Sequence, residues 1–155
     1  MLKFRCSECG KEYDITTRKF RCDCGGVFEL VGKHAEFPLE KIKSRKPAIW
    51  RYREAIPIDD EKNIVSIGEG FTPLIPIEYE NFNLIAKLDF IFPTGSFKDR
   101  GSSVLVSKLK ELEIRKIVED SSGNAGASIS AYTAKAGIDC EIFCRHVHLK
   151  ANLRR

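Results

Sequence analysis

The sequence predicts an α/β fold in which crossover helices join the strands of a parallel sheet, preceded by a small cysteine-rich lobe. Two observations support this prediction. Between residues 83 and 144, short apolar stretches alternate with segments of helical periodicity. Four of the six cysteines lie within residues 1–32, a distribution typical of a lobe held together by side-chain ligation rather than by a hydrophobic core.

The elements of the predicted α/β part follow one another without a long interruption. In chain order they are a strand at 84–88, a helix at 98–113, a strand at 116–118, a helix at 124–136 that ends before Gly137, and a strand at 138–144. Ligands of parallel sheets bind at the carboxyl ends of the strands, where strand-to-helix loops meet. We therefore expect loops 93–96 and 121–124 to lie at one edge of the sheet.

The chain divides into three parts by composition. Residues 1–32 form the cysteine-rich lobe, residues 33–80 carry five of the six prolines and are expected to be a connector with short helices, and residues 81–155 form the α/β part. Hydrophobic content of 43% and charged content of 31% are typical of a globular protein. No apolar run is long enough for a membrane span and the N-terminus lacks a signal sequence, which predicts a cytoplasmic protein.

The net charge of +4 is concentrated at one end of the chain. Residues 145–155 contain four basic and no acidic residues, so the remaining chain is neutral. Nucleic-acid-binding proteins more often spread a basic patch through the fold. Nucleic acid is therefore not an expected partner.

The four N-terminal cysteines have the spacing of a metal site. They form two close pairs separated by twelve residues, Cys6 with Cys9 and Cys22 with Cys24. Two such pairs can converge on one tetrahedral ion, so we predict a zinc-ribbon-like lobe that binds Zn²⁺. The alternative is a lobe of free thiols held by packing alone.

Lys98 is the first candidate catalytic residue. A turn at residues 93–96 delivers it to the first turn of a predicted helix, where the positive end of the helix dipole disfavours an ammonium group. We expect burial among Phe92 and Phe97 to act in the same direction. A neutral lysine is a nucleophile that can form a Schiff base with an aldehyde cofactor. A surface lysine is the alternative interpretation.

A second polar loop, at residues 120–126, follows a predicted strand and opens a predicted helix. Its hydroxyls and backbone amides can form a cradle for an anion such as a carboxylate. Asn124 adds a side chain that can hydrogen-bond a phenolic oxygen. The alternative is an ordinary helix N-cap.

Residues 93–101 and 121–126 together resemble the motifs of the fold-type II pyridoxal-phosphate enzymes, and more narrowly those of the threonine synthase family. Residues 49–54 and 68–74 resemble the family segments that precede the cofactor lysine. The N-terminal cysteine lobe is similar to that of archaeal and some bacterial members. The resemblance covers about residues 5–144.

The resemblance implies a reaction and a set of site residues. Lys98 would bind pyridoxal phosphate and move protons, Asn124 would contact the 3′-oxygen of the cofactor, and Lys87 would lie near the substrate phosphate. The substrate carboxylate would be held by Ser121, Ser122, Gly123, Asn124 and Ala125. The implied reaction converts O-phosphohomoserine and water to threonine and phosphate.

The sequence departs from the family in two respects. Ala125 stands where many members have threonine, and the glycine-rich loop for the cofactor phosphate has no counterpart here. We therefore expect the N-terminal part of such an enzyme, with an incomplete site and an exposed apolar surface through which it can form homo-oligomers. The alternatives are another fold-type II enzyme, such as a cysteate synthase or a threonine dehydratase, or an inactive zinc-ribbon fragment that acts as a binding module.

Overall fold

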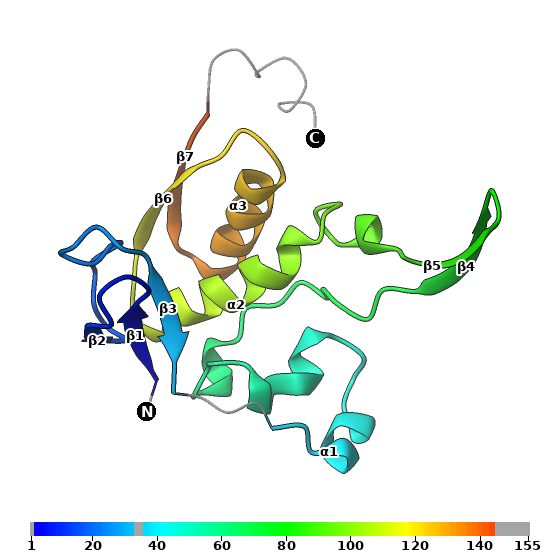
Figure 1. The fold of residues 1–155 in the computed structure, drawn as a ribbon, viewed down its shortest axis with the longest axis horizontal. Coiled ribbons are helices and arrows are strands. Elements are labelled where there is room, and N and C mark those ends of the chain that lie inside the picture. The colour runs from blue at the N-terminus through cyan, green and yellow to red at the C-terminus, as the bar shows by residue number, and fades with distance from the viewer. Residues whose placement is uncertain (1, 33–35, 145–155) are drawn as a thin grey trace.

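A computed structural model describes residues 2–32 and 36–144 and shows an α/β protein with three separate small sheets (Figure 1). The helices and strands of these ranges are β1 (Lys3–Cys6), β2 (Glu12–Asp14), β3 (Phe28–Val31), α1 (Leu39–Ser44), the 3-10 helices η1 (Ile49–Ala55) and η2 (Glu61–Asn63), β4 (Leu74–Tyr79), β5 (Phe82–Lys87), the 3-10 helix η3 (Asp89–Ile91), α2 (Lys98–Glu111), β6 (Lys116–Asp120), α3 (Asn124–Ala136) and β7 (Asp139–Phe143). No helix of these ranges is long and apolar enough to cross a membrane. The basic segment 145–155 lies outside the described residues.

The N-terminal lobe is an antiparallel sheet with the strand order β2-β1-β3. Its apolar contacts are few: the rings of Phe4 and Phe28 stack with centroids 5.6 Å apart, and Tyr13 packs against Phe28. The buried side chains of the lobe include Cys6 and Cys22. So small an apolar core supplies little of the free energy that folding requires.

The α/β part contains the main hydrophobic core. β6 and β7 pair in parallel, and α3 connects them as a crossover helix. Val65, Val106, Ile129, Tyr132 and Ile138 form the buried cluster between the helices and this sheet. α3 ends at Gly137, whose left-handed conformation (φ 69°) lets its N–H reach the last turn. The predicted helices and the two predicted strands that follow them are therefore confirmed, with small shifts of their ends.

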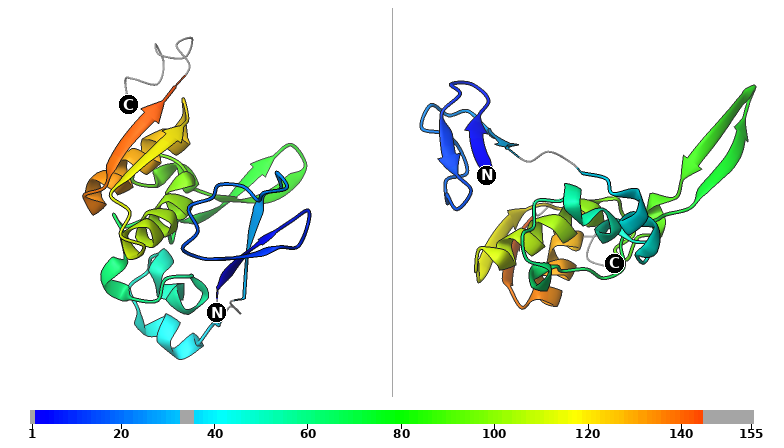
Figure 2. Two further views of the ribbon diagram at one scale, coloured as in Figure 1. Left: turned by 90° about the vertical axis from the view of Figure 1, so that its left-hand side faces the viewer. Right: turned by 90° about the horizontal axis from the view of Figure 1, so that it is seen from below.

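The strand predicted at 84–88 does not join the parallel sheet, and this prediction was wrong. β5 instead pairs antiparallel with β4, and a two-residue turn at Glu80 and Asn81 connects them. Figures 1 and 2 show this hairpin projecting from the α/β part. A short apolar run predicts a strand but not the strand with which it pairs. The segment directly before β5 pairs with it readily, because closing a short loop costs little entropy.

Candidate functional site

Lys98 is the first residue of α2 and follows a tight turn. Gly95 adopts a left-handed conformation (φ 77°), and its N–H donates to the carbonyl of Phe92 at 2.8 Å. The hydroxyl of Ser96 then accepts a hydrogen bond from the N–H of Lys98 at 3.2 Å. The turn therefore presents the Lys98 side chain at the helix N-terminus, as the sequence predicted.

The surroundings of Lys98 differ from the expected ones. Lys98 is exposed, and its Nζ lies 4.8 Å from the ring centroid of Phe97, which is itself 58% exposed. Phe92 is buried but packs under the Arg100 guanidinium, 4.6 Å from its ring centroid. The expected burial of Lys98 between the two rings was therefore wrong, because no described segment packs over Phe97.

Asp99 fixes the loop that precedes Lys98. Its carboxylate is fully buried and accepts hydrogen bonds from the N–H of Thr94 at 2.9 Å and from the Thr94 hydroxyl. It also accepts one from Ser128 Oγ of α3 at 2.6 Å. Asp99 thus joins the turn, the start of α2 and the first half of α3.

The loop between β6 and α3 is folded around Ser121. Ser121 Oγ accepts hydrogen bonds from the N–H groups of Gly126 at 2.9 Å and Gly123 at 3.3 Å. A Cβ on Gly126 would lie 2.9 Å from the carbonyl oxygen of Ser121, so only glycine fits there. Ser121 therefore satisfies the start of α3 in place of a side chain at the N-cap Gly123. The hydroxyl of Ser121 has this local structural role, and its contact with a substrate carboxylate stays a prediction.

The first turns of α2 and α3 lie close together because the two helices pack side by side (Figure 1). The expectation that the 93–96 and 121–124 loops share one sheet edge was wrong, because β5 pairs with β4 and lies outside the parallel β6-β7 sheet. Ser128 Oγ donates to Asp99 at 2.6 Å and contacts Ser102 Oγ at 2.8 Å. Asp99 directly follows Lys98, and Ser128 lies one helical turn after Asn124. The N-terminal ends of the two helices, which carry Lys98 and the 121–125 loop, are therefore neighbours.

A buried carboxylate that was not predicted from the sequence forms hydrogen bonds with both of these helices. Glu69 is 0% exposed and accepts hydrogen bonds from Ser103 of α2 at 2.6 Å and Tyr132 of α3 at 2.9 Å. Trp50 Nε1, Ser66 Oγ and the N–H of Ile67 donate to the same carboxylate. Burial first, and then the hydrogen bond to Glu69, raise the pKa of Tyr132 well above its usual range. A glutamate between two glycines looks like a surface turn, so no local pattern indicates this role.

Lys87 lies at a different place. It is exposed at the end of β5, and its Nζ donates to the carbonyl of Thr72 at 3.3 Å. It lines a cavity of about 580 Å³ together with Ala48, Ile49, Tyr52, Phe71, Thr72, Pro73, Leu74 and Arg100. Neither Lys98 nor a residue of the 121–125 loop lines this cavity. The expected position of Lys87 beside the substrate phosphate stays a prediction.

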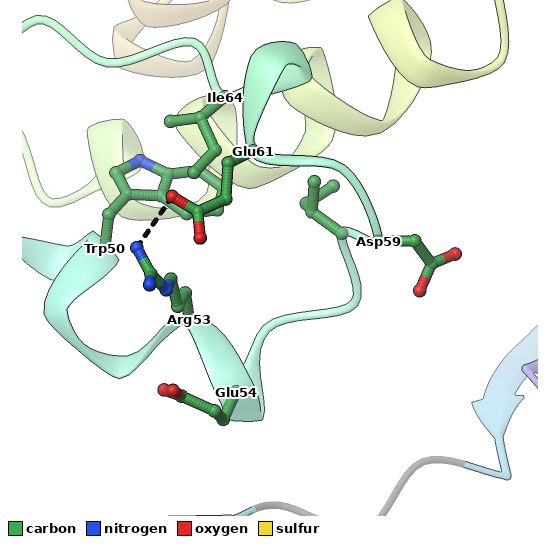
Figure 3. A pocket seen from close by; sticks show the side chains of 7 residues that line it. Trp50, Arg53, Glu54, Asp59, Glu61 and Ile64 are labelled. Carbon is green, nitrogen blue, oxygen red and sulfur yellow. Dashed lines mark hydrogen bonds and ion pairs between the residues drawn. The ribbon is translucent and has the colours of Figure 1, made fainter. Parts of the chain in front are cut away.

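A second cavity, of about 290 Å³, lies among the short helices of the connector (Figure 3). Its lining consists of Trp50, Arg53, Glu54, Ile58, Asp59, Glu61 and Ile64. Arg53 and Glu61 form an ion pair of 2.7 Å across it. None of the predicted site residues lines this cavity, so it is separate from the Lys98 site.

The four N-terminal cysteines converge as predicted. All four Sγ atoms lie within 4.8 Å of one another, and the pairs Cys6–Cys24 and Cys9–Cys22 are each 3.5 Å apart. Tetrahedral ligation with Zn–S bonds of about 2.3 Å places sulfur atoms roughly 3.8 Å apart. A Cβ on Gly26 would lie 2.5 Å from Cys6 Sγ, so the lobe leaves room for sulfur and not for a side chain. The cluster fits a metal ion.

The protonation of the free thiols is uneven. The backbone N–H of Cys24 and the Tyr13 hydroxyl lower the pKa of Cys22 to about 6. The N–H of Gly26 lowers the pKa of Cys24, but the three neighbouring thiols outweigh it and raise this pKa to about 12. Four adjacent thiolates repel one another, and a divalent cation removes that repulsion.

Comparisons with known proteins indicate the same enzyme family as the motifs at residues 93–101 and 121–126. Residues 65–155 match a protein family that is described as "Pyridoxal-phosphate dependent enzyme". The threonine synthase of Methanocaldococcus jannaschii is 39% identical over 145 residues, which cover 88% of this chain and 36% of that protein. The threonine synthase of Methanosarcina acetivorans is 36% identical, over 89% of this chain and 36% of its own length.

Among solved structures, an O-acetylserine dependent cystathionine beta-synthase from Helicobacter pylori is 20% identical, with a TM-score of 0.48 over 64% of this chain and 34% of that one. The chain spans about a third of the length of the curated relatives it matches. The family pattern covers more than half of the chain and includes Lys98 and the 121–125 loop. The chain belongs to the pyridoxal-phosphate dependent enzymes.

Proposed function

We propose that this chain supplies the lysine-bearing part of a threonine synthase, an enzyme that converts O-phosphohomoserine and water to threonine and phosphate. The observation that carries the proposal is the joining of the α2 and α3 N-termini through Asp99 and Ser128. This contact joins the helix that begins with an accessible lysine to the helix that follows the 121–125 loop, which supports the proposal. The 39% identity to the Methanocaldococcus jannaschii threonine synthase supports the choice of substrate.

The residues present fit pyridoxal phosphate at one side of the site. Lys98 is exposed and so is accessible to an aldehyde, and Asn124 is exposed at the neighbouring helix start. We propose that these two residues hold the cofactor, which when bound stabilises carbanions next to the amino-bearing carbon. Residues 121–125 would hold the substrate carboxylate, since the positive end of the α3 dipole favours an anion.

Within this proposal the chain's own residues bind, orient and move protons. The Lys98 amine accepts the proton removed from the substrate carbon and returns it later, as a positioned general base and acid. The phosphate of the substrate leaves and a water molecule adds at Cβ, so atoms and charge balance in threonine and inorganic phosphate. Asp99 positions Lys98 by fixing the preceding turn.

The remaining predictions belong to the same proposal. We propose a division into a zinc-ribbon-like lobe (1–32), a connector (33–80) and an α/β part (81–155), with the β4–β5 hairpin across the last boundary. We also propose that Cys6, Cys9, Cys22 and Cys24 hold one Zn²⁺, since their sulfur atoms have the separation that a tetrahedral ion needs. The enzyme would act in the cytoplasm on a small amino-acid substrate.

A chimera tests the reaction. The matching part of the Methanocaldococcus jannaschii threonine synthase is replaced by this chain, and the product is supplied with pyridoxal phosphate and three substrates in turn: O-phosphohomoserine, O-phosphoserine and threonine. We expect equal amounts of threonine and phosphate from the first, and none when Lys98→Ala is present. The matched control is Lys110→Ala, which removes another lysine of α2. Consumption of O-phosphoserine or threonine instead would overturn the choice of substrate.

A further inference from the structure

The four cysteines of the N-terminal lobe differ in how far solvent reaches them. Cys6 and Cys22 are buried, with 1% and 5% of their surface exposed, whereas Cys9 and Cys24 are exposed. Oxidants attack cysteines that are both ionised and accessible. With the Zn²⁺ proposed above bound to four thiolates, Cys9 and Cys24 are therefore the two ligands open to a reagent from solvent.

Hydrogen bonds to sulfur distinguish these two exposed cysteines. The backbone N–H of Gly26 donates to Cys24. Within residues 2–32 and 36–144, the structure shows no backbone N–H or hydroxyl group that donates to Cys9, whose contacts are with the sulfur atoms of Cys22 and Cys24. A hydrogen bond withdraws charge from a ligand sulfur and so makes it a weaker nucleophile. Cys9 is therefore the more nucleophilic of the two exposed ligands.

Cys22 is protected by a side-chain hydrogen bond as well as by burial. Its Sγ lies 3.1 Å from the Tyr13 hydroxyl, which is the donor when the sulfur is a zinc-bound thiolate without a proton. The Asp23 carboxylate competes for the same proton at 3.2 Å. That carboxylate already accepts hydrogen bonds from the ammonium groups of Lys11, at 2.9 Å, and Lys19. The Tyr13 proton is therefore directed to Cys22.

Cys9 and Cys22 are also in contact with each other. Their Sγ atoms lie 3.5 Å apart, and the Sγ atoms of Cys6 and Cys24 form a second pair at the same distance. An oxidised Cys9 therefore has a thiolate beside it. The reaction between them is intramolecular, so proximity favours it even though Cys22 is the weaker nucleophile.

We propose that the zinc-loaded lobe is modified by peroxide at Cys9, and that a Cys9–Cys22 disulfide then forms and releases the ion. The Cys9 thiolate attacks one oxygen of hydrogen peroxide, the O–O bond breaks, and hydroxide leaves the sulfenic acid. The Cys22 thiolate attacks this sulfur, the S–S bond forms, and a second hydroxide leaves. The two sulfur atoms lose two electrons, which reduce one peroxide molecule. Zn²⁺ loses two of its four ligands.

Peroxide titration of the zinc-loaded chain tests the proposal. Cys144→Ser serves as the starting protein, because this exposed thiol outside the cluster would consume peroxide. Zinc release is followed with a coloured chelator, dimedone traps sulfenic acid, and peptide mass spectrometry locates both products. We expect the first dimedone adduct of the cluster at Cys9, and a Cys9–Cys22 disulfide that accumulates in step with zinc release.

A matched pair of tyrosine variants tests the protection of Cys22. Tyr13→Phe removes the hydroxyl and keeps the ring, and we expect it to raise the rate at which iodoacetamide alkylates Cys22 in the zinc-loaded chain at least about threefold. Tyr79→Phe, in the exposed β4–β5 hairpin, is expected to leave that rate unchanged. An equal rate in all three proteins would show that the hydroxyl does not protect this sulfur.

The proposal rests on the zinc site, and its failure is distinguishable from failure of that site. A chain that loads no zinc would overturn both. A zinc-loaded chain that retains its ion in peroxide, reacts first at Cys24, or forms disulfides without the Cys9–Cys22 pair would overturn only the inference drawn here.

Discussion

Among single residues, Glu69 joins the two helices that carry the candidate site. It is a fully buried carboxylate, and its recorded partners are neutral donors from Trp50, from the 66–67 loop and from both helices. A buried carboxylate without a cation depends entirely on such hydrogen bonds. Its removal takes away the acceptor that the structure shows for Tyr132, Ser66 and the N–H of Ile67. Trp50 and Ser103 keep other acceptors, Ser103 Oγ and the Val65 carbonyl.

Glu69→Ala is expected to lower the free energy of unfolding by about 3 kcal/mol or more, because each unsatisfied buried donor costs about 1–3 kcal/mol. Glu69→Gln keeps one acceptor oxygen and is expected to cost less. Urea unfolding followed by circular dichroism measures both. An alanine variant as stable as the wild type would show that the carboxylate has no such role.

The ion pair between Arg45 and Glu54 makes stability depend on acid pH. Hydrogen bonding to Arg45 lowers the pKa of Glu54 to about 2 from its ordinary 4.5. A lowered pKa in the folded state means that the contribution is fully present above the ordinary pKa and is lost as the pH falls from 4.5 towards 2. We expect the difference in unfolding free energy between wild type and Glu54→Gln to shrink over this interval. A difference that does not change with pH would contradict this assignment.

At the scale of elements, the sequence predicts the helices better than the strand partners. α2 and α3 have helical periodicity and α3 has a stop signal at Gly137, so both were predicted close to their observed bounds. The β4–β5 hairpin could not be predicted as such, because an apolar run carries no information about its neighbour. The Glu69 network could not be predicted either, since Trp50 and Ser103 are 53 residues apart and meet only in the fold.

Two helical glycines with opposite surroundings test the packing of the 121–125 loop. Gly126→Ala places a methyl group 2.9 Å from the Ser121 carbonyl oxygen and is expected to destabilise the protein by about 1–3 kcal/mol. Gly101→Ala meets no atom within 4 Å and is expected to stabilise α2 by about 0.5–1 kcal/mol. Thermal unfolding of the two variants measures both effects. A stabilising Gly126→Ala would show that the loop is looser than described.

At the scale of the whole molecule, the two parts differ in what stabilises them. The α/β part has a buried core that includes Val106, Ile129 and Tyr132, whereas the lobe has one small aromatic group and the cysteine cluster. A lobe of this size without a core would derive its folding free energy largely from the Zn²⁺ that we propose for the cysteine cluster. Removal of the metal is therefore expected to unfold the lobe alone.

Elemental analysis of the purified protein is expected to find one zinc per chain, and none in Cys22→Ser. Chelation is expected to abolish hydrogen-exchange protection in β1 and β3 while α2 and α3 keep theirs. Cys144→Ser is the matched control, because this exposed cysteine lies outside the cluster. Full protection of the lobe after chelation would mean that packing alone holds it.

We propose that Lys98 is the lysine that binds pyridoxal phosphate. The most direct measurement adds less than one equivalent of the cofactor, reduces the mixture with borohydride and locates the modified lysine by mass spectrometry. We expect modification concentrated at Lys98, with Lys110 of the same helix unmodified and the label lost in Lys98→Ala. Modification spread over many exposed lysines, with no excess at Lys98, would contradict it.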